Sequence, residues 1–468
     1  MTRGPSRRRG PLFALLLFAG CGARPPAEGP PFTAPGVLYT AVPSEAAGDE
    51  GVAVRVAYPA RGSARYPDGA PVLVEVPGAH SGGQLDPPDA PTSLQVQSGL
   101  VMVQLLFPGT DTPQGASGGD FDYRGRRSQQ ALADVIRYAA GEAPDRDGLL
   151  LEDRLPFVRS DLVGLMGRSH GGNAAVLALE AHPDAAALLS WLSTWEAPLG
   201  SQHVTVELGH VGASPNAHYV PGSCTLEGCP WAEGAEDLRY DPVARVEVTD
   251  PRDGERVGMV GVLCLDLDAD RACGEADHLL RGVSGRMTAE EPLRLYLSVY
   301  LTDWLARSGL VADWPDHLAT PEAARAFWGE REGSRALVPL HLAAPDLPIL
   351  LLGTQTDHML APEDHPHLRL PLDALLASGH GFARMNPDAA YLSALTGISE
   401  GALPELPAGS PLPWPGTEGA LIPEAVEGVG LDPWVPVAAE LELFDRAWSD
   451  DWREDLGEPL RPVLRLGP

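Results

Sequence analysis

Short apolar segments alternate with amphipathic ones between residues 52 and 195. The apolar segments have the length of strands and lie at 52–59, 71–78, 99–109, 161–167 and 186–195. Between them, apolar residues at helical spacing predict helices over 126–141 and 171–184. Strands that alternate with helices in this way form a mostly parallel, doubly wound sheet with helices on both faces, and this is the α/β fold class that we expect.

The alternation stops near residue 200 and resumes with the apolar segment LPILLLGTQTDHM. We therefore expect a large insertion between two parts of one core, followed by an irregular tail rich in proline and tryptophan. Within the insertion, Thr288 and Glu291 fit a capping box and Gly309 a helix stop, which predicts one helix over 288–309. The expected boundaries are 1–20 for a leader, 21–35 for a proline-rich tether, 36–199 and 336–400 for the core, 200–335 for the insertion and 401–468 for the tail.

The leader has the pattern of a secretory signal, because the basic segment MTRGPSRRRG precedes the short apolar segment PLFALLLFAG. The stretch LFAGC resembles the lipobox of bacterial lipoproteins. The resemblance implies that Cys21 becomes the lipidated first residue, and Gly22 beside it implies the outer membrane. An ordinary cleaved signal is the alternative. We expect an exported protein that contacts the bacterial cell envelope only through a lipid anchor.

Charge and cysteine content narrow the class of partner. The formal net charge of -30 argues against nucleic acid as a partner and is typical of a soluble, self-repelling surface. Four cysteines remain after Cys21, and an exported chain predicts two disulfides among them. The near pairs Cys224–Cys229 and Cys264–Cys273 are the simplest of three connectivities, between which the sequence does not choose. It also leaves the oligomeric state open.

The stretch GRSHG at 167–171 is a G-x-S-x-G motif between a predicted buried strand and a predicted helix. This placement is what a nucleophile elbow requires, because a tight strand-to-helix turn exposes the serine hydroxyl. We predict that Ser169 is a nucleophile and that the amide of His170 faces an oxyanion. The alternative is a glycine-rich start of a helix with an idle serine.

A second oxyanion amide is expected from the loop after an earlier strand, in VLVEVPGAHSGG. Gly78 and Ala79 occupy the expected place, and we predict that the amide of Ala79 is the donor. His80 is a candidate substrate contact. A plain glycine-rich turn is the alternative.

A serine nucleophile needs a base and an orienting acid, in the chain order serine, acid, histidine. Asp357 ends a predicted buried strand and is the expected acid, and His380 in SGHGF is the expected base. If GFARMN is the last strand, His380 lies at its wrong end and His358 takes the role. Asp388 is a second candidate for the acid. A metal held by His358, His365 and His367 is a further alternative.

The segments GRSHGGNAA and SGHGF resemble the elbow and the histidine loop of dienelactone hydrolases and prolyl-oligopeptidase-type hydrolases. The resemblance implies an α/β-hydrolase fold and serine hydrolysis of a small-molecule ester or peptide, with no cofactor for catalysis. Proline at position 77, where many relatives carry histidine, and the large insertion depart from the family pattern. The rival hypothesis is a non-catalytic surface lipoprotein that acts as a binding module.

The insertion carries an acidic loop, CLDLDADRACGEADH, which resembles an EF-hand loop in the spacing of its oxygen ligands. Arg271 stands where that loop has glycine, and Asp277 replaces its last glutamate. A solvated acidic surface is the alternative to structural calcium. The candidate ligands are Asp266, Asp268, Asp270, Glu275 and Asp277.

Overall fold

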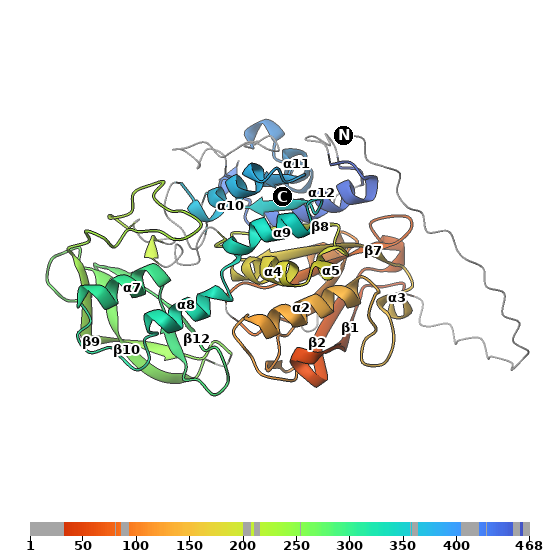
Figure 1. Cartoon of the computed structure of the whole chain (residues 1–468). Helices are drawn as coiled ribbons and strands as arrows, with labels where there is room; N and C mark the ends of the chain where they lie inside the picture. The colour runs from red at the N-terminus through yellow and green to blue at the C-terminus, as the bar shows by residue number, and fades with distance from the viewer. Residues whose placement is uncertain are drawn as a thin grey trace, which may run out of the picture.

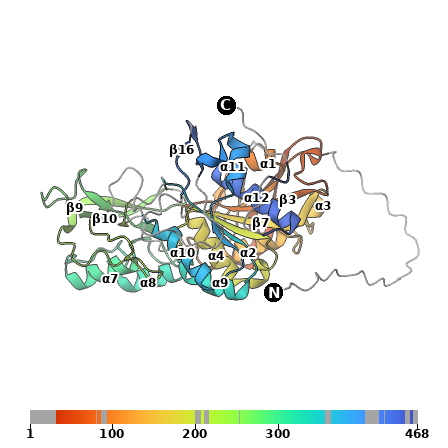
Figure 2. The ribbon, with the colours of Figure 1, turned by 90° about the horizontal axis from the view of Figure 1, so that it is seen from above.

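The computed structural model has an α/β core and a separate lobe beside it (Figures 1 and 2). The structure describes residues 32–79, 81–85, 93–199, 207–209, 216–252, 254–355, 357, 364–403, 421–426, 428–452 and 459–461. The predicted leader and most of the tether, with Cys21, lie outside the described residues, as do His80 and His358. Among the described helices, none is long and apolar enough to cross a membrane.

The core is built on one eight-stranded sheet with the order β1-β2-β4-β3-β7-β8-β14-β15. Strands β3, β4, β7, β8, β14 and β15 pair in parallel, and at one edge of the sheet β2 pairs antiparallel with both β4 and β1. The bounds are Gly36–Ser44 for β1, Gly48–Tyr58 for β2, Ala70–Val76 for β3, Val101–Leu105 for β4, Val158–Arg168 for β7, Trp191–Trp195 for β8, Ile349–Leu352 for β14 and Ala383–Met385 for β15. The predicted mostly parallel α/β sheet with helices on both faces is confirmed.

Helices cover both faces of this sheet. Alternate residues of β3 face opposite sides, so Val72 and Val74 join one apolar cluster while Leu73 joins another. The first cluster is covered by α2 (Arg126–Ala139), α4 (His170–Ala181), α9 (Leu337–Ala343) and α10 (Pro366–Ala377). The second is covered by α11 (Ala389–Thr396) and α12 (Val435–Ser449). This burial of both faces explains the continuous apolar pattern of the central strands.

The insertion forms the lobe that extends from the core in Figures 1 and 2. A three-stranded antiparallel sheet has the order β11-β10-β9, and a two-stranded sheet pairs β12 with β13. The bounds are Leu238–Thr249 for β9, Arg256–Leu265 for β10, His278–Leu280 for β11, Val283–Gly285 for β12, Arg294–Tyr296 for β13, Val299–Ser308 for α7 and Pro321–Gly329 for α8. Disulfides join Cys224 to Cys229 and Cys264 to Cys273, so the two near pairs are confirmed.

Small elements complete the described structure. The short helices are α1 (Leu94–Gln97), α3 (Leu151–Arg154) and α5 (Pro183–Ala186). Two-residue strands pair β5 (Asp111–Thr112) with β6 (Gly115–Ala116), and β16 (Ala425–Val426) with β17 (Val429–Gly430).

The helix predicted over 288–309 is shorter than expected. Pro292 disfavours a helical backbone at the residue before it, and the chain instead forms strand β13. The Oγ of Ser298 accepts a hydrogen bond from the amide of Leu301 at 2.9 Å, so helix α7 starts at Val299. The predicted stop is confirmed, because Gly309 has φ of 72°.

The C-terminal tail is not irregular throughout, because it contributes the buried helix α12. Its Asp445 is fully buried and accepts hydrogen bonds from Arg65 Nε at 3.0 Å and Nη2 at 2.7 Å. The hydroxyls of Tyr66 and Tyr391 each donate to the same carboxylate at 2.8 Å. This network links α12 to the start of the core and to α11. The sequence did not predict helix α12, because it occupies only 435–449 of a tail whose overall composition is rich in proline.

We predict that Asp445→Asn lowers the free energy of unfolding by about 3–5 kcal/mol, because it leaves the buried Arg65 guanidinium without a counter-charge. Urea unfolding followed by circular dichroism measures the change. Asp450→Asn is the matched control, because Asp450 is exposed and its left-handed backbone suits asparagine. Equal stability of the two variants would contradict the role of the network.

Candidate active site

Ser169 lies at a sharp turn between β7 and α4. Its backbone has φ of 48° and ψ of -126°, which L-residues rarely adopt. The amide of Ser169 donates to the carbonyl of Trp195 at 2.7 Å, and its carbonyl accepts from the amide of Gly172 at 2.9 Å. A non-glycine residue in such a conformation costs of order 1–3 kcal/mol and persists only where surrounding structure fixes it. The backbone therefore has the geometry of a nucleophile elbow.

The glycines beside the serine permit close approach of neighbouring segments. A β-carbon at Gly171 would lie 2.4 Å from the carbonyl oxygen of Val76, so no side chain fits there without movement of the backbone. A β-carbon at Gly78 would lie 3.3 Å from the β-carbon of Ser169. The end of β3 and the following turn thus lie directly against the elbow, as the oxyanion prediction requires.

The turn after β3 is held in place by a buried arginine. Arg124 donates through Nη1 to the carbonyl of Pro77 at 2.7 Å and through Nη2 to the carbonyl of Gly78 at 2.9 Å. It also contacts the carbonyl of Ser81 at 3.3 Å. Burial lowers the pKa of Arg124 to about 9. Ala79, within this turn, is exposed and has a left-handed backbone with φ of 54°.

Asp357 follows β14 and is fully buried. Its partner is His367, which the sequence did not predict for this role. The Oδ2 of Asp357 lies 2.5 Å from Nε2 of His367, and both side chains are buried. Burial and the neighbouring His367 lower the pKa of His365 to about 4, against an opposing effect of Asp357, so His365 is neutral at pH 7. His365 also has a left-handed backbone, with φ of 36°. The three side chains form one buried acid–imidazole group.

This group and Ser169 lie at the same edge of the sheet. Strands β7, β8 and β14 are parallel, and Arg168, Trp195 and Leu352 lie in register at their carboxyl ends. Ser169 directly follows the first of these residues, and Asp357 follows the last after a short loop. Among the described residues, no hydrogen bond joins the Ser169 hydroxyl to a histidine.

The prediction of His380 as the base is corrected by its position. Its Nδ1 lies 3.0 Å from Nδ1 of His341, and its Nε2 lies 2.6 Å from the carbonyl oxygen of Leu347. Leu347 precedes β14 and His380 precedes β15, so both lie at the amino ends of the strands, opposite Ser169. Helix α10 continues to Ala377, and this leaves the SGHG turn before the last strand rather than after it.

The other predicted acid, Asp388, has a structural role. Its side chain accepts a hydrogen bond from the amide of Ala390 at 3.0 Å and caps helix α11. Asn386 directly follows the carboxyl end of β15. The side-chain oxygen of Asn386 accepts from the amide of Gly353 at 2.9 Å, which braces the start of the Asp357 loop.

Sequence reasoning missed several residues at this edge. Thr354 donates to the Oε1 of Glu196 at 2.6 Å, and Glu196 is buried with φ of 47°. Both follow core strands next to Ser169, but neither belongs to a motif that could have indicated it. Arg124 was also missed, since a single arginine in a predicted loop carries no signal of burial.

The insertion contacts Asp364, which directly precedes His365 and the start of helix α10. The Tyr219 hydroxyl donates to Oδ2 of Asp364 at 2.7 Å, and the amide of Gly222 donates to the same oxygen at 3.3 Å. Burial raises the pKa of Asp364, while these hydrogen bonds oppose the shift. Asp364 is adjacent to His365, so the lobe supports the acid–imidazole group as well as lying beside the core.

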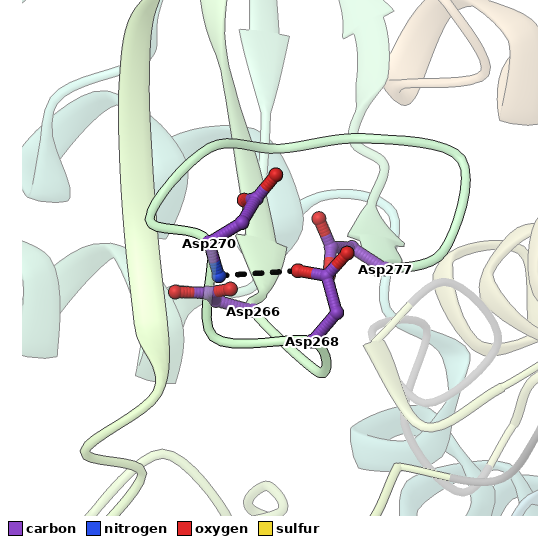
Figure 3. Close-up of side chains that lie close together, drawn as sticks. All are labelled: Asp266, Asp268, Asp270 and Asp277. Carbon is purple, nitrogen blue, oxygen red and sulfur yellow. Dashed lines mark hydrogen bonds between the residues drawn. The ribbon is translucent and has the colours of Figure 1, made fainter.

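The predicted acidic loop joins β10 to β11. Asp266, Asp268, Asp270 and Asp277 each offer an oxygen, and these oxygens all lie within 4.8 Å of one another (Figure 3). Glu275, predicted as a fifth ligand, is outside this group.

Comparison with known proteins adds structural neighbours only. No protein-family model and no curated protein matches the sequence. A bacterial heroin esterase matches over 36% of this chain and 45% of its own, at 14% identity and a TM-score of 0.25. Brefeldin A esterase, a bacterial homologue of human hormone-sensitive lipase, matches over 78% of this chain and 71% of its own, at 10% identity and a TM-score of 0.33. An α/β-hydrolase enzyme from a Medee basin deep-sea metagenome library matches over 36% of this chain and 58% of its own, at 12% identity and a TM-score of 0.25.

The chain spans less than half of the heroin esterase and less than two thirds of the metagenome enzyme. At these identities the likeness concerns the fold alone.

We predict that Gly171→Ala lowers the free energy of unfolding by about 1–3 kcal/mol, because its methyl group would displace the end of β3 from the elbow. Gly329→Ala is the control, since a β-carbon there would have no atom within 4 Å apart from its chain neighbours and the backbone of its own helix, and its φ is not positive. Thermal unfolding of both variants tests this. Equal melting temperatures would show that the elbow is looser than described.

Proposed function

We propose that this protein is a serine hydrolase that cleaves a carboxylic ester through an acyl-enzyme. The observation that carries the proposal is the backbone of Ser169, held at φ of 48° between a buried strand and helix α4. Strain of this kind is retained where the residue has a task that depends on its position. A turn that only connected a strand to a helix would not need a serine in this conformation.

The proposed reaction begins with attack of Ser169 Oγ on the acyl carbonyl carbon. A base takes the hydroxyl proton as the C–O bond forms, and the carbonyl oxygen becomes an oxyanion. The amides of His170 and Ala79 are the proposed donors to it, and the positive end of the α4 dipole lies at His170. The base then protonates the leaving alcohol, and water releases the acid by the reverse sequence.

We assign the base to His367 rather than to His380, because Asp357 lies 2.5 Å from Nε2 of His367. In this arrangement Asp357 stabilises the imidazolium through Nε2, and Nδ1 exchanges the proton with the serine. Nδ1 of His367 is buried and makes no hydrogen bond to a described residue. A movement of the start of helix α10 that brings Nδ1 of His367 to Ser169 Oγ is part of the proposal.

We also propose that the mature chain is exported and held at the cell envelope by a lipid on Cys21, with the tether separating the core from the membrane. The support is the lipobox resemblance alone.

The first experiment treats the purified mature protein with a fluorophosphonate and locates the adduct by mass spectrometry. We expect labelling at Ser169 and no labelling of Ser169→Ala. The rate of p-nitrophenyl acetate hydrolysis by that variant should fall by about 10³-fold or more. Ser160→Ala is the control for loss of a serine hydroxyl. A folded protein that is not labelled would favour the binding-module alternative.

A second experiment compares the histidines one by one as His→Asn variants. We expect His367→Asn to lower kcat by about 10³-fold or more, because it removes the imidazole paired with Asp357, and His380→Asn to leave kcat within about threefold. His358→Asn and His365→Asn identify the base if it is not His367. A large loss in His380→Asn with an unchanged melting temperature would contradict the assignment.

A further inference from the structure

The acidic loop between β10 and β11 has the geometry of a cation site. Its four aspartates project toward one another from a single loop (Figure 3), and their oxygens all lie within 4.8 Å. They carry four negative charges when ionised. Such a grouping is unfavourable in water unless it is solvated or neutralised, and solvation alone is common for exposed carboxylates.

A second observation separates this loop from an ordinary acidic surface. Asp266 is 4% exposed, and its Oδ1 is buried with no hydrogen bond to a described residue. Its Oδ2 accepts from the amide of Arg271 at 3.1 Å and lies 3.5 Å from Nε of Arg239. A buried carboxylate oxygen without a partner costs free energy, and a cation in the loop would remove that cost.

The other three aspartates are fixed by backbone amides of the same loop. Asp268 Oδ1 accepts from the amide of Asp270 at 3.2 Å. Asp270 Oδ1 accepts from the amide of Ala272 at 2.8 Å. Asp277 accepts from Leu267 at 2.8 Å and from Gly274 at 2.7 Å. Each carboxylate keeps lone pairs beyond these bonds, so the contacts orient the oxygens without exhausting them.

We propose that this loop binds one calcium ion through Asp266, Asp268, Asp270 and Asp277. All four ligands are oxygen, which suits a hard cation and disfavours zinc. Calcium accepts six to eight oxygens in a flexible geometry, and backbone carbonyls and water supply the remainder. The Cys264–Cys273 disulfide closes one side of the loop. The proposal goes beyond the hydrolase function and does not rest on it.

We expect the ion to stabilise the part of the lobe around Asp266, which contacts the segment directly before β9. The amide of Asp266 donates to the carbonyl of Asp237 at 3.0 Å, and Asp237 lies 2.5 Å from Nε2 of His218. His218 precedes Tyr219, whose hydroxyl donates a hydrogen bond to Asp364 of the core. We expect calcium to act on stability and on this support, not on the chemistry at Ser169.

The test is direct calcium binding to the full mature chain, freed of metal with a chelator and followed by isothermal titration calorimetry with calcium chloride. Exported calcium modules bind with Kd on the order of 0.1–1 mM, and we expect one site in that range. Asp268→Asn should weaken binding by about tenfold or more. Asp268 is exposed, so this substitution leaves the fold intact, which circular dichroism verifies.

Glu275→Gln is the matched control, because it removes the same charge from the same loop at a residue outside the cluster. Preferential weakening by Asp268→Asn supports the site. No saturable binding, or equal weakening by the two variants, overturns it and leaves a solvated acidic surface. A Ser169→Ala protein that binds calcium normally keeps this result separate from any failure of the hydrolase proposal.

Discussion

At the end of β7 the chain reverses into α4 within a single residue, and the backbone of Ser169 is strained to do so. Two glycines allow neighbouring segments to lie close to this turn. Gly171 lies against the Val76 carbonyl, and Gly78 lies against Ser169. A larger residue at either glycine would separate the strand ends. The close approach of the turn after β3 and the start of α4 therefore depend on this one tight turn, whose strain is offset by the buried strands on both sides.

Two buried charged side chains, Arg124 and Asp445, hold segments of the core together. Arg124 gives its hydrogen bonds to carbonyl oxygens of the turn after β3, where a guanidinium can satisfy several acceptors from one rigid group. On the opposite face of the sheet, Asp445 gathers Arg65, Tyr66 and Tyr391 around one carboxylate of α12. Both groups order segments that are distant in sequence. Because each is buried, loss of one partner would leave another unsatisfied, and this makes the geometry specific.

The insertion contacts the core beside the buried Asp357–His367 pair. Tyr219 reaches Asp364, which lies next to His365 and close to the Asp357–His367 pair. Two hydrogen bonds from the lobe thus fix Asp364 beside His365, and the loop between strands β10 and β11 of the same lobe carries the four aspartates.

The sequence alone determined the sheet and the elbow, because buried parallel strands leave long apolar runs and a G-x-S-x-G turn needs local glycines. It also predicted two disulfides, without choosing their pairing, and the aspartate spacing of the acidic loop. It could not decide which histidine meets Asp357, since SGHGF has the same letters before a strand as after one. Only the tertiary structure placed His380 at the amino edge and His367 beside the acid. Side-chain partners across a sheet depend on where each strand ends, and a shift of a few residues exchanges the two edges.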